Sequence, residues 1–302
     1  MKRFKNAGDV KVGVIGYGGA FNMGREHLKG MMEAGMSPSV VAEIDPERRK
    51  VAEEDFPGLR GFDSVTRMLK QSDVDLVVLI TPHNTHAKLA LQCLRAGRHL
   101  LSEKPLAITT AECDAMIREA KKRNLLLSTY HNRHWDGCVM EAVHHIVKEK
   151  ALGEVYRIAA HIGGYDQHGD RWRSSKTISG GILYDWGVHL LEYALQIIKS
   201  DVVEVSGYAK TGFWAPKTTW KKDTNEDVAS AVVRFKKGEW VTLTVTTLES
   251  NPKPGQLEIT GTKGSYIIDG RTYELIQQVG DKQIVTKGNN RPSAWGAFYK
   301  NI

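Results

Sequence analysis

Short apolar runs rich in β-branched residues alternate with helical stretches through the first 131 residues, and this alternation constrains the fold more than any other feature. The runs include residues 10–16 (VKVGVIG), 74–81 (VDLVVLIT) and 98–105 (RHLLSEKP). Uninterrupted apolar strands are typical of a parallel sheet covered on both faces, with helices as the crossovers. The pattern predicts an α/β chain whose first domain, residues 1–130, is a doubly wound parallel sheet.

The second half of the chain has a different texture. Its apolar runs alternate with polar residues and are linked by short turns with glycine, which predicts a largely antiparallel open sheet. We expect an α+β domain over residues 131–302, with one helix from about Asp185 to Lys199. The expected strands are residues 154–162, 201–210, 227–235, 239–248, 256–262 and 264–270. The last ten residues, SAWGAFYKNI, are typical of the start of a helix, so we expect the C-terminal end to be incomplete.

Composition excludes several function classes. A hydrophobic content of 41% and a charged content of 25% are ordinary for a soluble globular protein. The net charge is +7, but the basic residues are scattered, so we expect no nucleic-acid partner. The three cysteines form no C-x-x-C pair, which favours a reducing cytoplasmic compartment and no metal site. The N-terminus lacks an apolar secretory core, and the apolar runs are too short to cross a membrane.

A glycine turn follows the first predicted strand. Gly16 and Gly18 have G-x-G spacing between a strand and a helix, where glycine lets the backbone approach a pyrophosphate at the helix N-terminus. The third glycine of the dinucleotide fingerprint would fall at Phe21, which Gly19 and Gly24 flank. The turn predicts dinucleotide binding; the alternative is a tight turn that binds nothing.

An acid stands at the end of the second predicted strand. Asp45 can accept hydrogen bonds from the ribose hydroxyls of a dinucleotide and would repel a 2′-phosphate, which favours NAD over NADP. The alternative is that Asp45, which Pro46 follows, simply caps the next helix. Glu43 is a rival acid, and Arg48 or Arg49 could weaken the discrimination.

Two groups of residues could carry chemistry. The first is Glu103-Lys104-Pro105, which ends a predicted parallel strand where ligands bind in such sheets; a surface ion pair is the alternative. The second is Asp185 and His189, four residues apart and therefore on one face of a helix. Histidine can exchange a hydroxyl proton near neutral pH, whereas a core histidine beside a capping aspartate is the alternative.

These motifs together resemble the Gfo/Idh/MocA family of oxidoreductases. The similarity runs through residues 81–107 (TPHNTHAKLALQCLRAGRHLLSEKPLA) and 180–189 (GGILYDWGVH), and residues 131–137 (HNRHWDG) resemble the branch with inositol and sugar dehydrogenases. By position, the resemblance implies catalytic roles for Lys104, Asp185 and His189. Two departures are Phe21, where a small residue is common, and Glu192, where aspartate is frequent.

The resemblance also implies cofactor and substrate contacts. The cofactor contacts it implies are Gly16, Gly18, Gly19, Ala20, Phe21, Asp45, Thr81, Pro82, Asn84, His86, Glu103, Lys104 and Asn132. The substrate contacts it implies are Lys104, Arg133, Asp185 and His189. It further implies a homodimer or homotetramer through the C-terminal sheet.

A polar, aromatic and basic segment, residues 163–176 (GGYDQHGDRWRSSK), is a candidate substrate loop. A tryptophan can stack on a sugar ring, and an arginine can meet a carboxylate or phosphate. The residues that could line a pocket are Tyr165, Asp166, His168, Trp172 and Arg173. The alternative is a surface loop in which the Trp-Arg pair packs locally.

We therefore expect an NAD(P)-dependent dehydrogenase that transfers a hydride between nicotinamide and a hydroxyl carbon of a sugar, cyclitol or related polyol. One alternative is an enzyme that cleaves glycosides through transient ring oxidation and recycles its bound NAD. Another is an NAD-binding regulator without catalytic activity, which the presence of both Lys104 and His189 disfavours.

Overall fold

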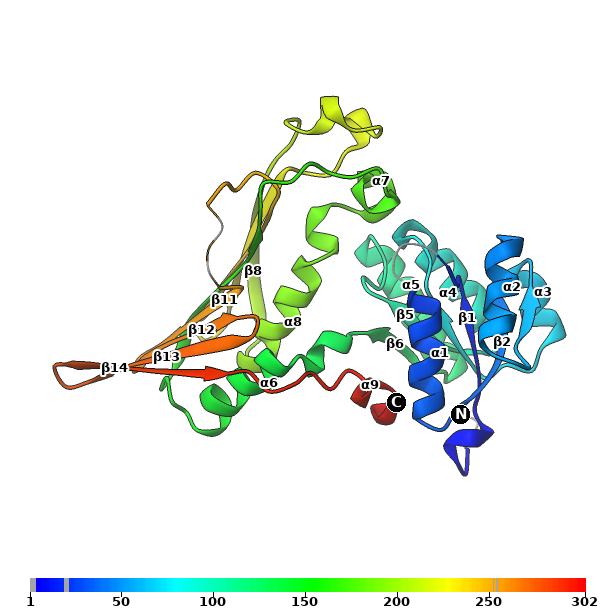
Figure 1. Ribbon diagram of the computed structural model, residues 1–302, viewed down its shortest axis with the longest axis horizontal. Coiled ribbons are helices and arrows are strands. Elements are labelled where there is room, and N and C mark those ends of the chain that lie inside the picture. Colours follow the sequence, from blue (N-terminus) through cyan, green and yellow to red (C-terminus); the bar gives the residue numbers. More distant parts are fainter. Residues whose placement is uncertain (1–3, 19–21, 252, 254) are drawn as a thin grey trace. The chain divides into compact units, whose positions relative to one another are not determined.

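The computed structural model describes residues 4–18, 22–251, 253 and 255–302, which form two compact units. The first unit contains the chain up to His131 together with Gly296–Ile302, and the second contains Asn132–Trp295 (Figure 1). The C-terminal residues thus differ from the expected second-domain placement. They join the first unit because Phe298 and Tyr299 are buried there, at 5% and 3% exposure.

The first unit is built on a six-stranded parallel sheet with the order β3-β2-β1-β4-β5-β6. Its strands are β1 Lys11–Ile15, β2 Ser37–Ala42, β3 Arg60–Phe62, β4 Leu76–Leu79, β5 His99–Glu103 and β6 Leu127–Tyr130. The doubly wound sheet is confirmed. The sequence did not predict β3, because three residues that include Arg60 and Gly61 carry too little apolar pattern to read as a strand.

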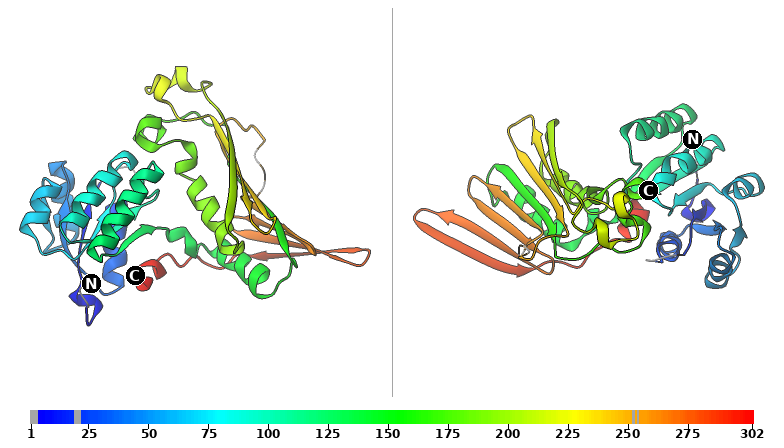
Figure 2. Two further views of the ribbon diagram at one scale, coloured as in Figure 1. Left: turned by 180° about the vertical axis from the view of Figure 1, so that it is seen from behind. Right: turned by 90° about the horizontal axis from the view of Figure 1, so that it is seen from above.

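Helices cover both sides of this sheet (Figure 2). They are α1 Met23–Glu33, α2 Pro46–Asp55, α3 Val65–Gln71, α4 His86–Arg95 and α5 Thr110–Arg123, with a short α9 at Ala297–Asn301. Every residue of β4 is buried, which explains its uninterrupted apolar sequence. One core cluster joins β4 and β5 to α4 and α5 through side chains such as Leu79, Leu94, Leu100 and Met116.

The strand order reverses between β1 and β4, because the chain first moves outward through β2 and β3 and then returns to the other side of β1. In open α/β sheets this reversal leaves a crevice outside the carboxyl ends of the strands, where ligands bind. Gly16 follows β1 and Thr81 lies just beyond β4. The two segments predicted to contact a nucleotide therefore lie at the switch point.

The second unit is built on an eight-stranded sheet with the order β14-β13-β12-β11-β7-β10-β9-β8. Among the strand pairs described in this sheet, only β7 and β10 are parallel, so the predicted antiparallel character is confirmed. The strands are β7 Val155–Gly163, β8 Val202–Lys210, β9 Val228–Phe235, β10 Trp240–Thr246, β11 Leu257–Gly261, β12 Gly264–Asp269, β13 Thr272–Val279 and β14 Lys282–Asn289. The hairpin of β13 and β14 was not predicted, because most of its residues are polar or exposed.

One face of this sheet packs on α8, Gly187–Ile197, which contacts β7 and β10 (Figure 2). Alternate residues of β10 are buried, as expected of a sheet with one covered face. The core joins Leu190 and Tyr193 of α8 to Ile158, Val241 and Ile259 of the strands. The remaining helices are α6 Gly137–Val143, which a π-helical turn His144–Lys148 extends, and α7 Lys176–Ser179.

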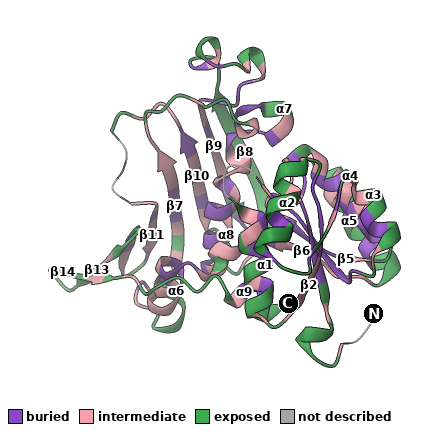
Figure 3. Cartoon of the chain, turned by 45° about the vertical axis from the view of Figure 1, so that its right-hand side comes forward, coloured by how far each residue is buried: buried purple, intermediate pink, exposed green. Residues whose placement is uncertain are grey.

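The edge strand β8 is exposed along almost its whole length (Figure 3). Val203, Val205 and Tyr208 are 58%, 62% and 75% exposed. Self-association through this sheet stays a prediction. Within the described ranges, every helix is too short or too polar to cross a bilayer.

The contact between α1 and the turn after β1 requires a residue without a side chain at Gly24. A Cβ there would come within 2.7 Å of both the Cα and the carbonyl oxygen of Tyr17, and backbone atoms cannot move aside cheaply. We expect Gly24→Ala to lower the free energy of unfolding by about 1–3 kcal/mol, although alanine favours helices. Gly8→Ala is the control, since its Cβ would come no closer than 3.6 Å to a neighbour. Equal urea midpoints for the two variants would refute this packing role.

Candidate active site

The glycine turn after β1 leaves no room for a side chain at Gly16. This residue has a φ of +87°, and its N–H donates to the carbonyl of Ala42 at 2.9 Å. A Cβ at Gly16 would lie 2.4 Å from the Ile80 carbonyl oxygen beyond β4. A Cβ at Gly18 would instead meet Cδ of Arg48 at 2.3 Å. The turn thus offers bare backbone at the switch point, which fits a pyrophosphate.

Three of the predicted cofactor contacts, Gly19, Ala20 and Phe21, lie outside the described residues. The third glycine of the fingerprint usually lets the helix pack closely; here a close approach of α1 is found at Gly24, against the backbone of Tyr17 in the turn after β1. The sequence offered this glycine, but its spacing did not identify its role.

The two acids after β2 have different environments. Glu43 is 7% exposed, and its carboxylate accepts the N–H groups of Tyr17 at 2.8 Å and Asp45 at 3.0 Å. It is therefore committed to holding two loops together. Asp45 is more open, with a side chain 42% exposed.

Asp45 also caps α2, as the alternative interpretation supposed. Its Oδ1 accepts the N–H groups of Glu47 at 3.0 Å and Arg48 at 3.3 Å. Its other oxygen lies 3.5 Å from Nε of Arg48. One oxygen of Asp45 caps the helix, and the other forms an exposed ion pair with Arg48. A ribose hydroxyl could still compete with Arg48 for this second oxygen.

The predicted contacts after β4 divide between surface and interior. Asn84 is exposed, whereas His86 is fully buried, at 0% exposure. The His86 ring lies 2.9 Å from the carbonyl oxygens of both Thr81 and Pro105. Burial lowers the pKa of His86, although these carbonyls act in the opposite direction. His86 thus ties the loop after β4, which contains Pro82, to the turn after β5.

Lys104 lies directly after β5, at the carboxyl end of the strand next to β4. Its N–H donates to the Glu103 carboxylate at 3.1 Å, and Pro105 after it is held by His86. The turn that carries the predicted catalytic amine is therefore fixed from both sides. These contacts argue against the alternative interpretation of Glu103 and Lys104 as a surface ion pair.

In the second unit, His189 lies in the first turn of α8 and is 5% exposed. Asp185 lies before the helix, which starts at Gly187 rather than at Asp185 and ends at Ile197 rather than Lys199. The expected placement of both residues on one helical face is therefore wrong, because three residues of 3₁₀ helix end at Tyr184 and the chain re-forms an α-helix only after Trp186. The ring of Trp186 meets that of His189 edge-on, with centroids 5.5 Å apart.

Arg133 completes this part of the second unit. It lies with Asn132 in a short 3₁₀ helix, Asn132–Trp135, and its guanidinium stacks 4.4 Å from the ring centroid of Trp186. NH1 of Arg133 donates to Asp136 at 3.1 Å. Burial opposes its charge, but Tyr193 and Asp136 outweigh burial and raise the pKa of Arg133.

The buried carboxylate of Asp136 was not predicted. It also accepts hydrogen bonds from Tyr193 Oη and from Nε1 of Trp295, the latter at 2.6 Å. No spacing in the sequence links these residues, since Trp295 lies 159 positions after Asp136.

The candidate substrate loop is divided by the structure. Arg173 stacks on Trp172, 4.7 Å from its ring centroid, which is the local packing that the alternative supposed. Nε of Arg173 also lies 3.9 Å from Oδ1 of Asp185, so the structure brings these two predicted substrate contacts together. Tyr165 is 53% exposed and packs instead on the ring of Trp214, with centroids 5.4 Å apart.

The other two residues of the loop do not join Arg173 and Asp185. Asp166 is exposed, and Nε2 of His168 lies 3.1 Å from the carbonyl oxygen of Glu226.

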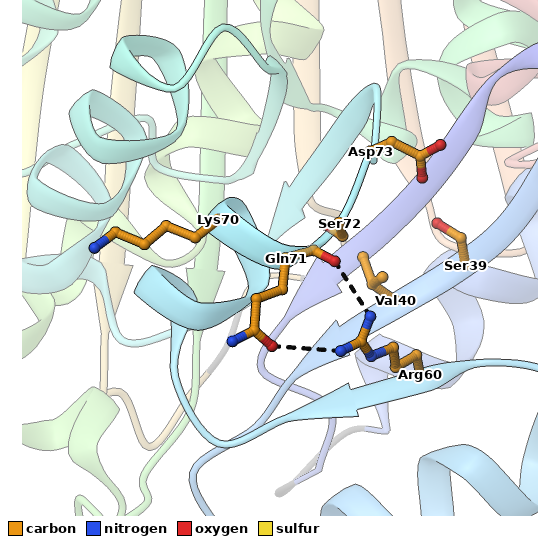
Figure 4. A pocket seen from close by; sticks show the side chains of 7 residues that line it. All are labelled: Ser39, Val40, Arg60, Lys70, Gln71, Ser72 and Asp73. Atoms are coloured by element: carbon orange, nitrogen blue, oxygen red, sulfur yellow. Dashed lines mark hydrogen bonds between the residues drawn. The ribbon is translucent and has the colours of Figure 1, made fainter.

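An open hollow of about 390 Å³ lies elsewhere in the first unit (Figure 4). It is lined by Ser39, Val40, Arg60, Lys70, Gln71, Ser72 and Asp73. Arg60 begins β3, and the segment after α3 leads into β4, so the hollow lies toward the amino ends of the strands. Ligands of doubly wound sheets bind at the opposite edge, so it is not the predicted nucleotide site. Among the described residues, no cluster of three or more His, Cys, Asp or Glu has the geometry of a metal site.

Comparison with known proteins agrees with this architecture. Residues 10–131 match the model of an oxidoreductase family with an NAD-binding Rossmann fold, and residues 140–267 match the Gfo/Idh/MocA C-terminal domain. The two units thus define an NAD-binding oxidoreductase class. The chain belongs to the Gfo/Idh/MocA family, and the resemblance seen in the sequence is confirmed.

Individual relatives are distant. The chain is 26% identical over 198 residues to the scyllo-inositol 2-dehydrogenase (NADP(+)) of Bacillus subtilis, with 65% of this chain and 54% of the relative aligned. It therefore spans about half the length of that relative. It is also 26% identical over 278 residues to the myo-inositol 2-dehydrogenase of Thermotoga maritima, with 90% of this chain and 80% of the relative aligned. Among solved structures, an NAD-binding protein from Listeria innocua has a TM-score of 0.77 at 26% identity. The match covers 96% of this chain and 85% of that protein's chain.

Glu226 anchors the segment that leads to Asp185. It is 8% exposed; its carboxylate accepts the Ile182 N–H at 2.9 Å and pairs with Nζ of Lys176 at 2.9 Å. Burial acts to raise the pKa of Glu226, but these two hydrogen bonds prevail and lower it.

Because the folded pKa of Glu226 is depressed, its stabilisation is complete above the unfolded pKa and is lost as pH falls through the folded pKa. We expect Glu226→Gln to reduce the free energy of unfolding at pH 7 by about 1–3 kcal/mol. The difference from the wild type should shrink between about pH 5 and 3. Urea titrations across this range check it, with exposed Glu154→Gln as the control; a difference that does not vary with pH would contradict this account.

Proposed function

We propose that the protein is an NAD-dependent dehydrogenase that transfers a hydride between nicotinamide and a hydroxyl carbon of a sugar, cyclitol or related polyol. One observation carries the proposal: the bare turn at Gly16 and the clamped turn at Lys104 follow strands that flank β4 on either side. Both turns thus lie at the carboxyl edge of the sheet, where a dinucleotide and its reaction partner bind in this fold.

The chemistry divides between the cofactor and the chain. When bound, the nicotinamide ring accepts or returns a hydride. His189 removes the hydroxyl proton of the substrate as general base, and Lys104 stabilises the negative charge that develops on the same oxygen. Asp185 positions a neighbouring hydroxyl. Arg133 and Arg173, each stacked on a tryptophan, supply donors to substrate hydroxyl or carboxylate groups.

A polyol ring is the substrate class that the family relationship supports. Two relatives carry the names of inositol dehydrogenases, and a cyclitol offers adjacent hydroxyls that the guanidinium donors of Arg133 and the carboxylate acceptor of Asp185 would recognise. Purified protein incubated with NAD and a panel of inositols, sugars and sugar acids, followed at the absorbance of NADH, identifies the substrate. Inactivity with every polyol would refute the proposal.

The catalytic assignment is tested with Lys104→Ala and His189→Ala. Each variant should lose at least about 100-fold in kcat, because each removes a group that acts on the reacting oxygen. NADH binding, measured by fluorescence titration, should persist in His189→Ala, which leaves the first unit unchanged. Lys88→Ala, at an exposed position of α4, is the control. Normal turnover in either site variant would remove that residue from the mechanism.

We further propose that NAD is preferred over NADP. Asp45 presents a negative, partly exposed carboxylate after β2, which repels a 2′-phosphate. Arg48 opposes this preference, since its side chain covers Gly18 and pairs with Asp45.

Cofactor preference is tested with Asp45→Asn, which retains the helix cap and loses only the charge. We expect it to lower the ratio of kcat/KM for NAD over NADP by about 10-fold or more, because a shift of 1.4 kcal/mol is enough for that change. Arg48→Ala should raise the ratio by weakening NADP. Unchanged ratios in both variants would assign the preference to other residues.

A further inference from the structure

A buried chain of polar groups connects the C-terminal helix to the turn of the proposed catalytic lysine, and the mechanism above does not use it. The hydroxyl of Tyr299 hydrogen-bonds Nδ1 of His27 on α1. Nε2 of His27 lies 3.0 Å from Oε1 of Glu103. The second oxygen of Glu103 accepts the N–H of Lys104 at 3.1 Å. Both oxygens of this carboxylate therefore have directed partners.

The packing around His27 is specific. His27 is fully buried and Tyr299 is 3% exposed. The ring of Tyr130 lies 4.3 Å from that of His27 and stacks on Tyr299 at 5.8 Å, centroid to centroid. Gly30, one turn along α1 from His27, leaves room for the Tyr299 ring, since a Cβ there would come within 2.9 Å of Cδ2. The position of α9 thus brings the Tyr299 hydroxyl into hydrogen-bonding contact with the His27 imidazole.

The donors and acceptors along this chain of groups are mutually consistent. Burial acts to raise the pKa of Glu103, but the hydrogen bonds from His27 and from the Lys104 N–H, together with the charge of Lys104, prevail and lower it, so the carboxylate is ionised. Burial raises the pKa of Tyr299, so its phenol keeps its proton. An ionised carboxylate only accepts, which assigns the N–H of His27 to Nε2. In this tautomer Nδ1 carries no proton and accepts from the Tyr299 hydroxyl.

We infer that Tyr299 and His27 are positioning residues for Lys104, an inference that rests on the proposed dehydrogenase function. Tyr299 selects the His27 tautomer that donates to Glu103, and the oriented Glu103 carboxylate fixes the backbone of Lys104. Without the Tyr299 hydroxyl, Nδ1 of His27 is left buried without its donor. The ring can then carry its proton on Nδ1 instead, which turns the Nε2 lone pair toward the Glu103 carboxylate and loosens the turn of Lys104.

The test compares Tyr299→Phe with Tyr130→Phe in the full chain. Both remove one hydroxyl from the same aromatic cluster, but only the first breaks the chain of bonds to Glu103. We expect Tyr299→Phe to lower kcat by about 10-fold, which is typical for the loss of a residue that orients a group in direct contact with the reacting atoms. The dissociation constant for NADH should change less than two-fold. Tyr130→Phe should keep kcat within two-fold of the wild type. Equal kcat values for the two variants, or a loss confined to thermal stability, would overturn the inference.

A second measurement needs no variant. ¹⁵N NMR of histidine-labelled wild-type protein should show His27 as the neutral Nε2–H tautomer, with Nδ1 as a hydrogen-bond acceptor. An Nδ1–H tautomer would overturn the inference even if Tyr299→Phe fails to fold. The two proposals also fail separately: a wild type without polyol oxidation refutes the function, whereas an active wild type with an unaffected Tyr299→Phe refutes only the positioning role.

Discussion

A central constraint in the first unit is the close approach of the Gly16 backbone to the carbonyl of Ile80, where a Cβ would lie 2.4 Å from that oxygen. This approach joins the turn after β1 to the segment after β4, at the point where the strand order reverses. Gly24 imposes a similar constraint further along the chain, because the absence of a side chain there lets the start of α1 pack against the backbone of Tyr17. The proposed binding of the cofactor's pyrophosphate depends on these two contacts, because they leave bare backbone at the ligand edge of the sheet.

Buried or half-buried carboxylates then hold the loops in place. Each accepts main-chain N–H groups of a loop that carries or precedes a predicted site residue: Glu43 holds Tyr17 and Asp45, Glu103 holds Lys104, and Glu226 holds Ile182. A carboxylate suits this role because it offers several acceptor sites, and hydrogen bonds to a charged acceptor are stronger than neutral ones. A loop held in this way is fixed without a regular secondary structure, so its exposed side chains remain available for ligands.

The turn of Lys104, which carries the proposed catalytic amine, is held through the residues on both sides of it. His27 contacts Glu103, the residue before the lysine, and His86 contacts the carbonyl of Pro105, the residue after it. Both rings are fully buried, and neither could be assigned this role from spacing, since His27 lies 76 residues before Glu103. Burial makes their hydrogen bonds both stronger and more costly to lose.

The sequence by itself determined the elements that a strong local signal marks. Strands β1, β4 and β5, the antiparallel sheet, the glycine turn and the position of Lys104 after a parallel strand all follow from periodicity and from glycine chemistry. The weak elements, β3 and the hairpin of β13 and β14, escaped because short or polar strands carry little hydrophobic pattern.

Only the tertiary structure decided which polar groups meet. It divided the roles of Glu43 and Asp45, placed Tyr165 against Trp214 rather than beside Arg173, and brought Tyr299 back to α1. These contacts join residues far apart in the chain, and their partners are selected by burial and hydrogen-bond geometry, which no local pattern encodes.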